Sequence, residues 1–281
     1  MSRKRKIAAL ALAGLLPLLL GGCFTIDVKI PMENGATAAV QETQAVPVQE
    51  TQAAAPDTQP AAAAPQAGGD LTAMSQAEQL AYFNDALNRI KANNVGFKKS
   101  KLTATEDITL SNSLANSLVG IVKGALLSET AAETTVNKGE NSNAVMSPYN
   151  VPYVSQLTMD DITGIEAVPD NGGYVITVRV KGETNPEPTG SICSRIFEFM
   201  TVDDVETTYA PKVGAEVARE DIEVVFNDCF AKATIDADGN VTGYETFVKG
   251  TMNLRNAKIK VITTDVSVVL ASTTTYTDFK Y

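Results

Sequence analysis

The sequence predicts an α+β domain in which two N-terminal helices pack on a curved antiparallel sheet. Apolar residues first recur at helical spacing, over about residues 75–92 and 111–126. From about residue 170 onward they alternate with polar residues, and Asn-Gly and Asp-Gly turns separate the alternating segments. Helical segments followed by a run of strands are typical of the α+β class, because α/β folds alternate the two.

The first helix is predicted to begin after Ser75. Ser75 and Glu78 match a capping box, in which the serine accepts from the Glu78 amide and the glutamate reaches back. The residues that follow share one apolar face: Ala77, Leu80, Phe83, Leu87 and Ile90. Asn93, Asn94 and Gly96 then end the helix, because asparagine and glycine favour the backbone conformation found there.

A strand is expected over 97–110, and a second helix begins at Ser111 or Ser113. The second helix carries its own apolar stripe: Leu114, Leu118, Ile121, Val122 and Leu126. We expect it to cover a sheet face supplied by Ile176 and Val178. The chain has no tryptophan and few other aromatic residues to fill the space beneath. The prediction is therefore an apolar ligand pocket of roughly several hundred cubic ångströms.

The remaining elements are a polar loop over 128–150 and a series of strands. Hairpin turns are predicted at 170–173 and 236–240, where Asp, Asn and Gly cluster. In the last strand the apolar residues change phase, which predicts a bulge or sharp bend near 261–264. The spacing of Asp236, Asp238 and Asn240 invites a calcium loop. Val241 and Phe247 stand where such a loop needs glycine and glutamate, so no metal is expected.

The N-terminus has the layout of a secretory signal peptide. Four basic residues (3–6) precede an apolar run of 14 residues, Ile7 to Leu20, which is too short to cross a bilayer comfortably. An uncleaved membrane anchor is the alternative. The run Leu20-Gly21-Gly22-Cys23 resembles the lipobox of bacterial lipoproteins. That resemblance implies cleavage after residue 22, lipidation of Cys23, and an extracytoplasmic protein anchored to the membrane by its lipid.

Residues 23–70 form a predicted disordered tether, rich in Ala, Gln, Thr and Pro, in which 40–45 recurs as 48–53. The tether is either a spacer that lifts the domain from the membrane or slack linker. A single domain is expected over 71–281, which is long enough for a sizeable core.

The charge of the chain disfavours nucleic acid as a partner. The net charge is −10, and residues 1–22 contain four basic and no acidic residues, so the mature chain carries −14. The chain has no histidine, which removes Ser-His-Asp and Cys-His nucleophiles and the usual catalytic zinc site. Catalysis by carboxylates, lysine or tyrosine stays open, but no catalytic residue or cofactor is expected.

If Cys23 is lipidated, Cys193 and Cys229 are the remaining cysteines. Both lie in segments expected to be strands, 192–200 and 222–235. In an oxidising compartment they can form a disulfide; otherwise they are two buried free thiols.

Four segments carry a second resemblance: 157–162, 170–178, 183–186 and 235–241. They resemble an uncharacterised family of exported domains in Gram-positive gut anaerobes. The arrangement of helices on a curved sheet is also similar to lipid-carrying lipoprotein domains. We therefore expect a non-enzymatic binding domain for an apolar or envelope ligand. A structural or adhesive surface module is the second hypothesis, and a carboxylate-type hydrolase is the third.

Overall fold

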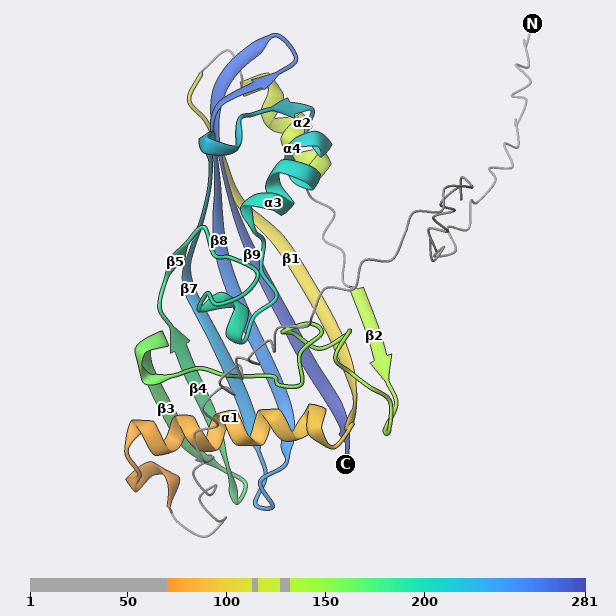
Figure 1. Ribbon diagram of the computed structural model, residues 1–281, viewed down its shortest axis with the longest axis vertical. Coiled ribbons are helices and arrows are strands. Elements are labelled where there is room, and N and C mark those ends of the chain that lie inside the picture. Colours follow the sequence, from red (N-terminus) through yellow and green to blue (C-terminus); the bar gives the residue numbers. More distant parts are fainter. Residues whose placement is uncertain (1–69, 113–115, 127–131) are drawn as a thin grey trace, which may run out of the picture. The chain divides into compact units, whose positions relative to one another are not determined.

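The computed structural model describes residues 70–112, 116–126 and 132–281 (Figure 1). The α+β class is confirmed: one long helix accompanies a large antiparallel sheet that does not close into a barrel. The signal peptide (1–22), Cys23 and residues 24–69 of the tether lie outside the described residues. Within the described ranges, no helix is both long and apolar enough to cross a membrane.

The helices are α1 (Gln76–Ala92), α2 (Asn116–Leu126), α3 (Val202–Asp204) and α4 (Ala210–Lys212). The strands are β1 (Gly96–Leu110), β2 (Ala132–Val136), β3 (Ile162–Asp170), β4 (Gly173–Val180), β5 (Glu183–Thr184), β6 (Ala215–Glu216), β7 (Ile222–Ile235), β8 (Val241–Ile259) and β9 (Ile262–Lys280). The main sheet runs in the order β2-β1-β9-β8-β7-β4-β3. β5 adds to β7, and β6 adds to β8.

Helix α1 forms as the sequence predicts. Ser75 Oγ accepts from the Glu78 amide, and Glu78 Oε2 accepts from the Ser75 amide at 2.8 Å, which completes the capping box. Phe83, Leu87 and Ile90 on its apolar face are fully buried. The helix lies across one end of the long strands, over β3, β7 and β8 (Figure 1).

The end of the chain is a hairpin rather than one bent strand. β8 continues to Ile259, the chain turns at Lys260 and Val261, and β9 begins at Ile262. Lys260 has a φ of 58°, which the tight turn requires. The change of apolar phase was therefore correctly located, but its cause is a two-residue turn between strands of 19 residues each.

Strand β2 lies in the segment expected to be only loop. It pairs antiparallel with β1, from Phe97 opposite Val136 to Lys101 opposite Ala132. Residues 133–135 are exposed and polar, so this edge strand lacks the alternation that identifies a half-buried strand.

The two faces of the sheet are covered differently. Along β8, Tyr244, Thr246, Val248, Gly250 and Met252 are buried, whereas the residues that alternate with them are half-buried. The buried face receives α1 and the chain between β5 and β6, which we call the crossing segment (residues 185–214). The candidate site, described below, lies between the crossing segment and this inner face.

Candidate functional site

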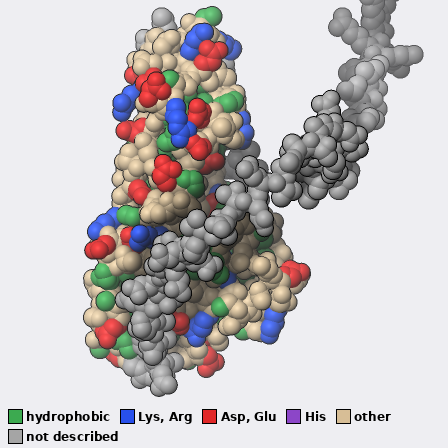
Figure 2. All heavy atoms as spheres, in the orientation of Figure 1, with side chains coloured by type: hydrophobic (Ala, Val, Ile, Leu, Met, Phe, Trp, Pro, Cys, Tyr) green, Lys and Arg blue, Asp and Glu red, His purple; other side chains and the backbone are tan. Residues whose placement is uncertain are grey.

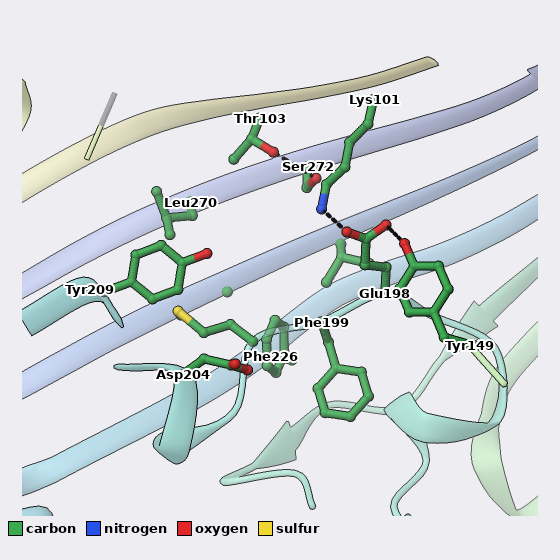
Figure 3. A pocket seen from close by; sticks show the side chains of 13 residues that line it. Lys101, Thr103, Tyr149, Glu198, Phe199, Asp204, Tyr209, Phe226, Leu270 and Ser272 are labelled. Atoms are coloured by element: carbon green, nitrogen blue, oxygen red, sulfur yellow. Dashed lines mark hydrogen bonds and ion pairs between the residues drawn. The ribbon is translucent and has the colours of Figure 1, made fainter. Parts of the chain in front are cut away.

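The candidate site is a pocket of about 300 Å³ between the inner face of the sheet and the crossing segment (Figure 3). The sheet contributes side chains from β1, β7, β8 and β9, and the crossing segment supplies the opposite wall. The lining residues are Lys101, Thr103, Tyr149, Glu198, Phe199, Met200, Asp204, Tyr209, Phe226, Val248, Gly250, Leu270 and Ser272.

One side of the pocket is a charged network around Glu198. Lys101 Nζ lies 2.5 Å from Glu198 Oε1, and Lys99 Nζ lies 3.1 Å from Oε2. Tyr149 donates its hydroxyl hydrogen to the same carboxylate and accepts from Lys99 at 2.8 Å. Lys99 also donates to the carbonyl of Val145. Two ammonium groups therefore share one carboxylate (Figure 3 draws the Lys101 and Tyr149 contacts).

The alternation of β1 places both lysines in this network. Lys99 and Lys101 are two residues apart, so they point to the same face, while Lys98 points to the other. Lys99 is opposite Tyr276 on β9, and its ammonium lies 6.0 Å from that ring. Its side chain is only 11 % exposed, so water screens its charge poorly.

The network determines the ionisation of its members. Burial by itself raises the pKa of Glu198, but attraction to Lys101, the hydrogen bonds from Lys101 and Tyr149, and attraction to Lys99 together lower it to about 2. Burial and the contact with Glu198 raise the pKa of Tyr149 well above its ordinary value. Glu198 is thus a carboxylate, and Tyr149 a neutral hydroxyl, throughout the physiological range.

The floor of the pocket is apolar. Phe226 and Leu270 point into it from β7 and β9, and Phe199 meets the Phe226 ring edge-on at 6.2 Å. Gly250 makes room for this ring: a Cβ there would lie 2.7 Å from Phe226 Cε1. The pocket therefore joins an apolar floor to a charged and hydroxyl-bearing rim.

A second hollow of about 520 Å³ adjoins the pocket. Four residues border both spaces: Tyr149, Glu198, Phe199 and Asp204. The contact between Tyr149 and Glu198 therefore lies where the two hollows meet.

The residues predicted to form a pocket with the second helix are not brought together. Leu118 and Val122 are buried where α2 lies against β1, while Ile176 and Val178 are buried on β4. Strands β9, β8 and β7 separate β1 from β4, so the two groups of residues do not line one pocket, contrary to the prediction. The pocket beneath the crossing segment is a different one and contains none of them. Leu114 and the side chains of Ile121 and Leu126 lie outside the described residues.

The two cysteines are free and buried. Cys229 lies on β7 as expected, but Cys193 begins a 3-10 turn, Cys193–Arg195, so the predicted strand there is wrong. Glu183 accepts from the amides of Ile192 and Cys193, and these contacts favour the turn. Burial raises the pKa of both thiols, that of Cys229 to about 11. The pair is in the form of two buried thiols, the second of the two alternatives.

The predicted hairpin turn at residues 236–240 is confirmed. Asp236 Oδ1 accepts from the amides of Asp238 and Asn240 at 3.0 and 2.8 Å. Within the described part of the chain, no three His, Cys, Asp or Glu side chains are grouped to hold a metal ion.

Sequence analysis missed Lys91, which is buried in the last turn of α1. Its ammonium donates to the carbonyls of Pro148 and Val151 at 2.6 and 3.2 Å, and burial lowers its pKa to about 8. These bonds attach α1 to the segment that carries Tyr149.

The lowered pKa of Lys91 predicts that the stability of the folded domain depends on pH. Between about pH 8 and the ordinary pKa of 10.5, the unfolded chain binds more protons than the folded one, so the contribution of Lys91 rises with pH. The unfolding free energy of the wild type minus that of Lys91→Met is expected to rise by about 2 kcal/mol from pH 7.5 to 9.5. Urea unfolding measures it, and exposed Lys98→Met is the control that should show no growth. An unchanged Lys91→Met difference would contradict the prediction.

Comparison with known proteins gives no relative: no protein-family model matches the chain, and searches of curated proteins and of solved structures also return no match. The fold and the pocket together define the class of the molecule as an α+β domain with a mixed apolar and charged pocket. Its function must be argued from that geometry.

Proposed function

We propose that this chain is a membrane-anchored extracytoplasmic lipoprotein whose domain binds an apolar or envelope-derived ligand without catalysis. The proposal takes Cys23 as the lipid attachment site and α1 and α2 as the two N-terminal helices on a curved sheet. The observation that carries it is the pocket, which combines an apolar floor with a polar rim. Such a combination suits an amphiphile, whose chain leaves water while its head group keeps polar partners.

The carboxylates of the pocket favour binding over hydrolysis. A glycosidase-type mechanism needs one carboxyl group with a raised pKa to act as a general acid. Glu198 has instead a lowered pKa, and Asp204 Oδ2 is occupied in accepting from the amide and hydroxyl of Thr201, both at 2.8 Å. Glu198 is therefore not suited to donate a proton, and Asp204 serves as the cap of α3.

The charge pattern also argues against nucleic acid. On the face seen in Figure 2, basic and acidic side chains are interspersed rather than gathered into a basic patch. With a mature net charge of −14, the lipid anchor and a pocket ligand are the partners we propose.

Native mass spectrometry of the purified mature chain tests the binding proposal. This chain starts at residue 23 and carries Cys23→Ser, so that no acyl group is attached. We expect a retained small molecule, and we expect Gly250→Ala to reduce it because the added Cβ displaces the Phe226 ring. Gly124→Ala is the matched control, since its Cβ meets nothing within 4 Å. A chain that never retains an amphiphile, including one added in excess, would exclude the binding function.

The second candidate is a structural or adhesive module that uses the outer face of the sheet. Thr273 and Thr275 on β9 lie on this face and are half-buried, and none of the described elements covers it. The rings of Phe230 and Phe247 stack there at 5.2 Å. In this case Thr275→Glu would reduce attachment to cell-envelope material while leaving retention of pocket ligands unchanged.

A further inference from the structure

The charged network at the rim of the pocket has a net positive charge, although the protein is acidic. The chain carries −10 overall, yet Lys99 and Lys101 share the single carboxylate of Glu198. Asp204, the other acidic residue of the lining, keeps its negative charge but lies outside this network, where its carboxylate accepts from Thr201 as the cap of α3. The network beside the apolar floor therefore has one more positive charge than negative charge.

The Glu198 side chain is well placed to be displaced from Lys101 by a ligand. It lies in residues 197–201, which have no regular secondary structure, whereas its two lysine partners are held on β1 between β2 and β9. Its carboxylate also borders the second hollow, so that a displaced side chain has space of about 520 Å³ beside it. Moving it requires no change in the sheet.

We propose that the ligand is an amphiphile with an anionic head group, a carboxylate or a phosphate, and that this head group takes the place of Glu198 at Lys101. The inference rests on the proposed binding function and adds the class of ligand and the residues that select it. The aliphatic chain lies on Phe226 and Leu270, which face the pocket from β7 and β9, the strands on either side of β8. Lys101 recognises the head group, and Glu198 holds the ammonium in position while the pocket contains no ligand.

Three probes with the same chain separate the head group from the tail: dodecanoate, dodecyl phosphate and neutral dodecanol. They are titrated calorimetrically, below their micelle concentrations, into the mature chain with Cys23→Ser. We expect one or both anions to bind about tenfold more tightly than dodecanol, since the charge-assisted hydrogen bond from Lys101 to an anionic head group is stronger than the one to an alcohol. The stronger of the two identifies the source, a fatty acid or a phosphate headgroup.

Substitutions of Lys101, Lys98 and Glu198 test the role of each side chain in binding the head group. Lys101→Gln is expected to abolish the preference for anions over dodecanol. Lys98→Gln is the matched control, because it removes the same charge from the same strand on the opposite face, where Lys98 pairs with Asp278 at 3.9 Å. Glu198→Gln is expected to strengthen anion binding about tenfold, since the internal competitor loses its charge. Circular dichroism checks that each variant is folded.

The outcomes separate this inference from the function on which it rests. If all three probes bind equally and Lys101→Gln changes the affinity for none of them, the pocket binds amphiphiles, but the proposed preference for an anionic head group is wrong. If Lys101→Gln and Lys98→Gln lose anion binding equally, the anions are attracted only by the long-range charge of the protein. That result would also overturn the proposed contact with Lys101. If folded Glu198→Gln binds anions more weakly than the wild type does, the proposed replacement of Glu198 by the head group is overturned. If no probe binds the wild-type chain, the binding function fails as well. Should Glu198→Gln not fold, the two lysine variants decide.

Discussion

Replacing Cys23 with alanine is expected to detach the protein from the membrane. The thiol of Cys23 is the group that the lipobox resemblance assigns to the diacylglyceryl anchor, and alanine offers no atom for that bond. Two acyl chains bury enough methylene groups, at about 0.8 kcal/mol each, for stable attachment, and without them the acidic chain has little affinity for anionic lipid. Fractionation should therefore find the variant in the soluble fraction, or as an unprocessed precursor.

Cys229→Ala is the control for this experiment. It removes a buried thiol from the domain and leaves the lipobox intact, so the protein should stay in the membrane fraction. Mass spectrometry of the wild-type N-terminus gives an independent check. A membrane-bound chain that still begins with Met1 would contradict lipidation and favour the uncleaved anchor.

Replacing Leu87 with alanine is expected to destabilise the domain by about 2 to 5 kcal/mol. Leu87 is 0 % exposed, at the centre of the face with which α1 covers the sheet. Truncation removes buried methyl groups and leaves a cavity that the sheet cannot close, because long paired strands resist local collapse. Urea unfolding of the mature chain measures the loss, which amounts to a large part of the stability of a typical domain.

Leu102→Ala is its matched control. This leucine on β1 is 49 % exposed, so the same substitution should change the unfolding free energy by no more than about 0.5 kcal/mol. A similar loss in both variants would mean that α1 does not hold the sheet in the way described.

The elements that the sequence predicted well are those whose signals are local. The capping box of Ser75 and Glu78, the apolar face through Phe83 and Leu87, and the turns at 170–173 and 236–240 each depend on residues a few positions apart. Such signals are present in a single segment before any tertiary contact forms. They were sufficient for the α+β class and the position of α1.

The missed features depend on neighbours far away in the chain. Strand β2 exists because β1 offers it an edge, and its own exposed polar residues carry no alternation. Ile176 and Val178 were assigned correctly to a strand, but the order of the strands placed that strand three strands away from β1, against which α2 lies. Strand order is set by the packing of the whole sheet, and no periodicity within one segment encodes it.

The sequence by itself predicted the signal peptide and the lipidation of Cys23. It also determined the acidic charge of the chain and the alternation that points Lys99 and Lys101 to one face of their strand. Only the tertiary structure decided that Glu198, about a hundred positions further along, meets them above Phe226. The physical reason is that residues 197–201, which carry Glu198, have no regular secondary structure of their own. Their position follows from the partners that the inner face of the sheet offers to a half-buried carboxylate, which must be paired to be stable there.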